Sequence, residues 1–128
     1  MSRTNATILV VDDNEASRYA TVRQLEAGGF RTLPAETGEQ ALSLADFASA
    51  VVLDVHLPDL HGFEVCRMLK QKKPGTPIVH LSAVYVARPY QRAGTWAGAD
   101  AYLVSPVEPA ELLETLDRLI DRAAAAPA

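Results

Sequence analysis

The chain has 128 residues, which is enough for one domain with its own core and too few for two. A hydrophobic share of 48% excludes a disordered chain, and no apolar run reaches the ~18 residues of a membrane span. The net charge of −4 argues against a general nucleic-acid-binding surface, while a single cysteine and an N-terminus without signal-peptide shape predict a cytoplasmic protein.

Short apolar runs alternate with longer helix-compatible stretches along the whole chain. Glycine follows the first helix-compatible stretch, as it commonly follows helices, and proline or acidic residues follow several apolar runs. In chain order the expected elements are a strand at 7–11, a helix at 15–27, a strand at 30–33 closed by Pro34, a helix at 37–45, a strand at 50–53, a helix at 62–72, a strand at 77–81, a helix at 89–97, a strand at 101–104 and a helix at 108–122. One domain is expected over residues 1–122, followed by an alanine-rich tail or linker stub at 123–128.

Strands that alternate with helices predict an α/β fold with a parallel sheet and helices on both faces. The strands are continuous apolar runs, which is typical of a sheet covered on both sides. Two doubly wound strand orders are common, and the dinucleotide-binding one carries a glycine-rich phosphate loop after its first strand. Here that loop is Asp12-Asp13-Asn14-Glu15, which has no glycine and would repel pyrophosphate. The sequence therefore predicts the flavodoxin-like order 2-1-3-4-5.

Carboxylates follow two strands that are neighbours in this order. Asp12 and Asp13 end the first strand and Asp54 ends the third, and such sheets bind ligands at the carboxyl ends of their strands. Three carboxylates in one place repel each other unless a cation joins them. Because Mg²⁺ prefers oxygen ligands, the sequence predicts a Mg²⁺ site, to which the backbone carbonyl of His56 could add a further oxygen.

Asp54 is also the candidate reactive group. A carboxylate is a competent nucleophile toward phosphorus, and phosphoryl transfer depends mainly on a metal and on positioned donors. Ser82 ends the fourth strand, where its hydroxyl could donate to an oxygen carried on Asp54. Simpler roles stay open: Asp13 or Asn14 could cap the following helix, Asp54 could be an ordinary loop carboxylate, and Ser82 could merely end a strand.

Five sequence blocks, in their order and spacing, resemble the receiver domain of bacterial two-component response regulators. The resemblance spans residues 6–122, nearly the whole chain. The blocks are Ile8 to Asn14, Val51 to Asp59, His61 to Cys66, Leu81 to Ala83 and Gly98 to Pro106.

The resemblance implies a signalling module of a phosphorelay rather than an enzyme. In such a domain Asp54 accepts a phosphoryl group from a histidine kinase or a histidine phosphotransfer protein. Asp12 and Asp13 hold Mg²⁺ together with Asp54. The resemblance also implies that Ser82 is the switch hydroxyl and Tyr102 the aromatic switch, which pass the signal to a downstream output domain or protein.

The segment after the fifth strand departs from the family's pattern. The family usually has a lysine before the proline at this place, whereas this chain has Ser105, and the resemblance implies a cis peptide bond before Pro106. A missing lysine removes a positive charge that would pair with phosphoryl oxygens, although Arg88 or Arg92 could reach in. A pseudo-receiver, an interaction module with the fold but little switching, is therefore the main alternative.

Other chemistry has less support in the sequence. A phosphatase with an aspartyl nucleophile would want a second carboxylate soon after Asp54, and Val55 and His56 follow instead. The three histidines are not at metal-ligand spacing, which argues against zinc. Cys66 has the spacing of a buried helix face and is predicted to lie in the core. Trp96 is either a core residue or, with Tyr102, part of a docking surface.

Overall fold

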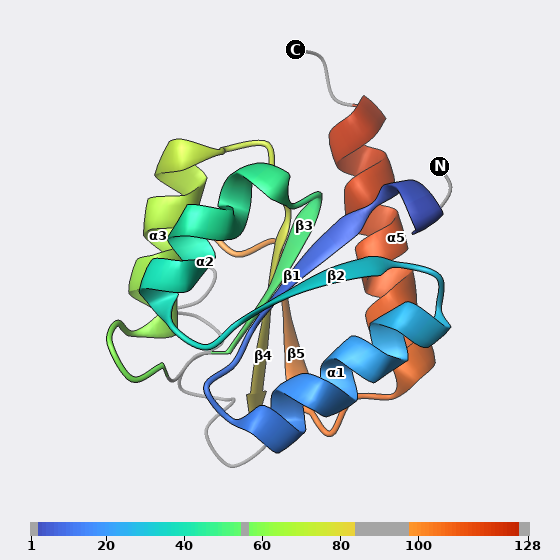
Figure 1. The fold of residues 1–128 in the computed structure, drawn as a ribbon. Coiled ribbons are helices and arrows are strands. Elements are labelled where there is room, and N and C mark those ends of the chain that lie inside the picture. Colours follow the sequence, from blue (N-terminus) through green and yellow to red (C-terminus); the bar gives the residue numbers. More distant parts are fainter. Residues whose placement is uncertain (1–2, 55–56, 84–97, 126–128) are drawn as a thin grey trace.

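A five-stranded parallel sheet lies between two layers of helices in the computed structural model, which describes residues 3–54, 57–83 and 98–125 (Figure 1). The strands are β1 (Thr7–Val11), β2 (Arg31–Ala35), β3 (Ala50–Asp54), β4 (Ile78–Ala83) and β5 (Ala101–Ser105). The helices are α1 (Glu15–Ala27), α2 (Gly38–Leu44), α3 (Gly62–Lys72) and α5 (Pro109–Ala125), with short 3-10 turns at Arg3–Asn5 and Ala45–Phe47. The helix expected at 89–97 lies outside the described residues.

The strand order is β2-β1-β3-β4-β5, and every neighbouring pair is parallel, so the predicted flavodoxin-like order is confirmed. Val11 of β1 is aligned with Leu53 of β3, and Asp54 is aligned with Leu81 of β4. The residues that follow β1 and β3 therefore meet at the same edge of the sheet.

Each face of the sheet has its own hydrophobic core. Helices α2 and α3 cover one face, and α1 and α5 cover the other (Figure 1). Alternate β1 residues point to the two faces: Leu9 and Val11 pack with α2 and α3, whereas Ile8 and Val10 pack with α5. Burial on both faces explains why the strands are continuous apolar runs rather than alternating ones. No helix in the described part of the chain is both long and apolar enough to cross a membrane.

Capping rather than an apolar stripe sets the limits of α1. Only Thr21 and Leu25 of this helix are buried. Its first turn is closed by the side chain of Asn14, which accepts a hydrogen bond from the backbone N of Ser17 at 2.8 Å. At the other end Gly29 has φ 101°, a conformation that glycine adopts without strain. The predicted bounds of α1 are those observed.

Several elements extend past their predicted ends, β2 and α5 among them. β2 continues through Pro34, which is aligned with Val10, because β2 is an edge strand and the missing N–H of proline is tolerated there. α5 continues from the expected end at Arg122 to Ala125, since alanine has the highest helix propensity. Part of the expected alanine-rich tail is therefore helical.

β4 is also longer than predicted, and this changes the place of a candidate site residue. Ser82 was expected at the end of the strand, but β4 runs to Ala83. Ser82 is aligned with Val104 and Ala83 with Ser105, so pairing with β5 carries the strand past its apolar run. Ser82 is consequently a strand residue, one position beyond the partner of Asp54.

Gly38, at the start of α2, lies close to side chains of α3 and of the loop before it. A Cβ at this position would lie 2.7 Å from Cγ2 of Val65 and 3.2 Å from Cδ1 of Leu60. Val65 is fully buried, so it cannot easily move aside. We expect Gly38→Ala to lower the free energy of unfolding by about 1–3 kcal/mol in urea titrations. Gly75→Ala is the control, because a Cβ there has no heavy atom within 4 Å. Equal losses in the two variants would contradict this packing argument.

Candidate functional site

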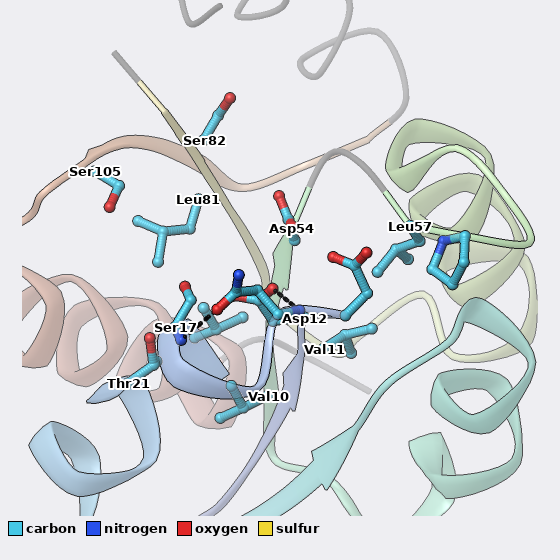
Figure 2. Close-up of a pocket in the computed structure, with 14 residues that line it drawn as sticks. Val10, Val11, Asp12, Ser17, Thr21, Asp54, Leu57, Leu81, Ser82 and Ser105 are labelled. Carbon is cyan, nitrogen blue, oxygen red and sulfur yellow. Dashed lines mark hydrogen bonds between the residues drawn. The ribbon is translucent and has the colours of Figure 1, made fainter. Parts of the chain in front are cut away.

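A cleft of 430 Å³ opens at the carboxyl ends of the strands (Figure 2). Residues from four of the five strands or from the segments that follow them line it. They include Asp12, Asp13, Asn14, Asp54, Leu57, Leu81, Ser82 and Ser105, together with Ser17 and Thr21 of α1. Among the described residues, the side chains that line the cleft include carboxylates and hydroxyls but no lysine or arginine.

Three carboxylates meet in this cleft. Asp12, Asp13 and Asp54 each present an oxygen, and these oxygens all lie within 4.8 Å of one another. Asp12 is only 8% exposed, while Asp13 is exposed and Asp54 is half-buried. The predicted convergence of these residues is thus observed, and an all-oxygen donor set of this kind fits a hard divalent cation such as Mg²⁺.

Backbone contacts hold the loop that carries the first two carboxylates. The backbone N of Asp12 donates to the carbonyl of Ala35 at 3.0 Å. Oδ1 of Asp12 accepts from the backbone N of Asn14 at 2.9 Å (Figure 2). Asn14 is the N-cap of α1, so the capping role that the sequence left open between Asp13 and Asn14 belongs to Asn14. The Asp13 carboxylate remains at the cleft.

The hydroxyl candidates lie on one side of Asp54, and Leu57 lies on the other (Figure 2). Ser82 is 3% exposed, and its Oγ has no hydrogen-bond partner among the described residues. Ser105 lines the same cleft, and its peptide bond to Pro106 is cis, as expected. His56, Arg88, Arg92 and Trp96 lie outside the described residues.

Tyr102 lies beside the cleft rather than in its lining, and it packs on His80. Tyr102 is aligned with His80 of β4, and their ring centroids are 5.9 Å apart. His80 is fully buried, its Nδ1 lies 3.3 Å from the carbonyl oxygen of Leu53, and its ring meets Phe63 edge-on at 5.0 Å. Burial lowers the pKa of His80 from 6.5 to about 4, so the ring is neutral at pH 7 and donates from Nδ1.

Two residues that the sequence did not single out hold the loops around the cleft. Arg18 donates from Nη1 to the carbonyl of Asp12 at 2.8 Å. The Asp59 carboxylate accepts from the backbone N of Gly38 at 2.9 Å and of Glu39 at 3.0 Å, and these hydrogen bonds lower the pKa of Asp59. Contacts of a side chain with distant backbone leave no signature in sequence spacing.

Cys66 has no role at the cleft. It is fully buried in the core on the α2 and α3 side of the sheet, as predicted. Burial raises the pKa of its thiol to about 11, so the thiolate that redox chemistry needs is scarce at neutral pH.

The known proteins that this chain resembles include receiver domains. The profile of the response regulator receiver domain family matches residues 8–117. The receiver domain protein (CheY-like) from Methanospirillum hungatei superposes with a TM-score of 0.86 at 30% identity, over 93% of this chain and 96% of that one. The BeF3-activated receiver domain of DrrB, from Thermotoga maritima, gives a TM-score of 0.83 at 34% identity, over 91% of this chain and 98% of that one.

Curated relatives include the response regulator MprA of Mycolicibacterium vanbaalenii, which is 42% identical over 117 residues. MprA of Mycobacterium avium is 40% identical over 117 residues. Both matches cover 90% of this chain, and the chain spans about half the length of these relatives, 50% and 51%. With the family profile, the strand order and the carboxylate cluster in agreement, the chain belongs to the response regulator receiver domains.

Proposed function

We propose that this domain accepts a phosphoryl group on Asp54 from a phosphohistidine, in a reaction that requires Mg²⁺, and that the modification switches a protein-interaction face. The observation that carries the proposal is the meeting of Asp12, Asp13 and Asp54 within 4.8 Å in one cleft. Receiver domains generally bind Mg²⁺ through acidic residues, and this cluster fits that donor set.

Four residues of the cleft have a part in the proposed transfer. An oxygen of the Asp54 carboxylate forms a bond to phosphorus, while the bond from phosphorus to the donor's imidazole nitrogen breaks and its electron pair stays on that nitrogen. Asp12, Asp13 and Asp54 would together hold the cation. A bound Mg²⁺ supplies positive charge that offsets the charge of the phosphoryl oxygens. Ser82 can then donate its hydroxyl to a phosphoryl oxygen.

The proposed partners follow from the family. A histidine kinase or a histidine phosphotransfer protein supplies the phosphoryl group, and an output domain or a downstream protein reads it. The curated relatives are response regulators about twice as long as this chain, which supports an output that lies outside these residues. We place the reaction in the cytoplasm, where such kinases expose their phosphohistidine.

A pseudo-receiver is the second candidate, and Ser105 is the observation that favours it. Ser105 lines the cleft where the family usually has a lysine. Without that charge, the phosphoryl group has fewer contacts that differ between the inactive and the active state. The protein would then bind its partners with little dependence on phosphorylation.

Asp54 should be the sole site of phosphorylation by a small acyl phosphate. We expect intact-protein mass spectrometry to show one added phosphoryl group in the presence of Mg²⁺ and none in EDTA. Asp54→Asn should abolish the added mass, because it removes the nucleophilic oxygen. Asp59→Asn is the matched control: it changes a carboxylate in the next loop and retains a side chain that can cap α2. Labelling of Asp54→Asn, or labelling in EDTA, would refute the proposed function.

Mg²⁺ should stabilise the unmodified protein. A ligand that binds only the native state adds about 2.7 kcal/mol at a hundredfold excess over Kd, which for a domain of this size raises Tm by roughly 10 °C. Asp13→Asn should lose most of this increase. Asp46→Asn should retain it, because Asp46 is exposed, pairs with Lys72 and is not among the three clustered carboxylates. Thermal unfolding across a Mg²⁺ titration measures the effect, and an unchanged Tm at millimolar Mg²⁺ would count against a formed site.

A further inference from the structure

Arg18 holds the loop of the clustered carboxylates from two directions. Its backbone N donates to the carbonyl of Asn14 at 2.9 Å, and its Nη1 donates to the carbonyl of Asp12 at 2.8 Å. One residue of α1 therefore contacts the carbonyls of both chain neighbours of Asp13, namely Asp12 and Asn14. The backbone N of Asp12 is held independently by Ala35, so the Asp12 carbonyl is the end of this residue that depends on Arg18.

The position of Arg18 is costly for the helix that carries it. A cation in the first turns of a helix faces the positive end of the helix dipole. The side chain is also only 13% exposed, and its carboxylate partner in the described part of the chain is Glu36, at 3.4 Å and itself 63% exposed. An arginine placed to stabilise α1 would be better near the C-terminus of the helix. The contact that its position does provide is the short bond to Asp12.

We propose that Arg18 is a positioning residue of the cation site, an inference that rests on the proposed function. By fixing the Asp12 carbonyl, its guanidinium fixes the direction in which Asp12 and Asp13 present their carboxylates to the cation. Groups that orient metal ligands in this way commonly change metal affinity by tenfold or more when they are removed.

The direction of the effect separates positioning from simple electrostatics. Arg18→Met retains a long apolar side chain and removes both the hydrogen bond and the positive charge. If the charge alone mattered, its loss beside three carboxylates would strengthen Mg²⁺ binding. If Arg18 positions the loop, the same variant should weaken Mg²⁺ binding about tenfold. Arg18→Lys retains a charged donor and should recover most of the affinity.

The test is a Mg²⁺ titration of the full chain. Amide NMR spectra recorded at each step report both the fold and the Kd for Mg²⁺. Arg67→Met is the control, because it removes one positive charge from an exposed side chain that pairs with Glu64 on α3. Rates of labelling by a small acyl phosphate give a second readout: the Mg²⁺ concentration at half-maximal rate should rise about tenfold in Arg18→Met, and the rate at saturating Mg²⁺ should change little.

The outcomes distinguish the two ideas. Wild-type protein that binds no Mg²⁺ would refute the proposed function and this inference with it. Wild-type binding together with unchanged or tighter binding by Arg18→Met would overturn the inference and leave the proposed function standing. A lower Tm of Arg18→Met with an unchanged Kd would also overturn it, because a purely structural role predicts that result.

Discussion

Acidification from pH 7 to pH 4 is expected to remove about 3 kcal/mol of folding stability through one side chain, His80. This histidine is fully buried between Leu53, Phe63 and Tyr102, and burial lowers its pKa from 6.5 to about 4. Its Nε2 has no hydrogen-bond partner among the described residues, so a second proton would have no acceptor there. The positive charge of a protonated His61 would disfavour that proton further.

The sign of this pH dependence follows from the pH at which the folded and the unfolded state each take up the proton. The unfolded chain protonates this histidine below its ordinary pKa of 6.5, whereas the folded protein does so only near pH 4. The stabilisation by neutral His80 is therefore fully present above pH 6.5 and is lost progressively as the pH falls to about 4. Each unit of pKa difference corresponds to about 1.4 kcal/mol, which is the source of the expected loss.

Urea unfolding between pH 7 and pH 4 measures this loss, with EDTA present to remove cation binding. His80→Phe retains a ring that can pack on Phe63 and removes the proton site. The stability difference between wild type and His80→Phe should change by about 3 kcal/mol over this range, because carboxylates titrate alike in both proteins. His61→Asn retains an N-cap side chain for α3 and should leave the pH dependence close to that of wild type. Parallel pH profiles for wild type and His80→Phe would refute the role of His80.

Ser105→Lys is expected to increase the ratio of active to inactive conformation about ten- to a hundredfold when the site carries a phosphoryl analogue. A phosphoryl group shifts a two-state equilibrium only through contacts that differ between the states. In this cleft the described side chains able to donate to it are uncharged, the hydroxyls of Ser82 and Ser105 among them. A lysine ammonium would add a charge-assisted hydrogen bond, which is worth about 1.5–3 kcal/mol and is stronger than a bond between neutral groups.

Beryllofluoride with Mg²⁺ serves as the analogue, and the fluorescence of Trp96, the single tryptophan, reports the change. Ser105→Met is the matched control, because it adds length without charge. A larger fluorescence change in Ser105→Lys than in Ser105→Met would show that the missing charge limits switching. If the natural protein already gives the full change and Ser105→Lys adds nothing, another cation supplies the contact, with Arg88 the first residue to test.

Local signals explain which elements could be predicted from the sequence. The predicted bounds of β1, α1 and α3 agree with the structure. β1 is a continuous apolar run, and each of the two helices begins directly after a residue whose side chain caps it, Asn14 for α1 and His61 for α3. The place of Ser82 inside β4 depends on pairing with Val104, and the passage of β2 through Pro34 depends on its edge position. Both are consequences of distant chain segments that a local pattern does not report.

The candidate site divides in the same way. The sequence predicts that Asp12, Asp13 and Asp54 lie together, because the predicted strand order places the ends of β1 and β3 side by side. The contacts of Arg18 with a carbonyl, and of Asp59 with two backbone N–H groups, involve partners that every residue possesses. Such contacts become visible only when the backbone is placed in three dimensions.

The strand order also has a consequence for how the chain folds during synthesis. β1 lies between β2 and β3 in the sheet. Its partner β2 follows it directly along the chain, but its other edge has no partner until β3 is made, whose Ala50 aligns with Ile8. At roughly 5–20 residues per second, a ribosome needs several seconds to make the segment between β1 and β3. Throughout that interval the unpaired N–H and C=O groups along this edge of β1 are open to pairing with other chains. This interval is longer for β1 than for β3 or β4, because shorter segments separate those strands from their next partners.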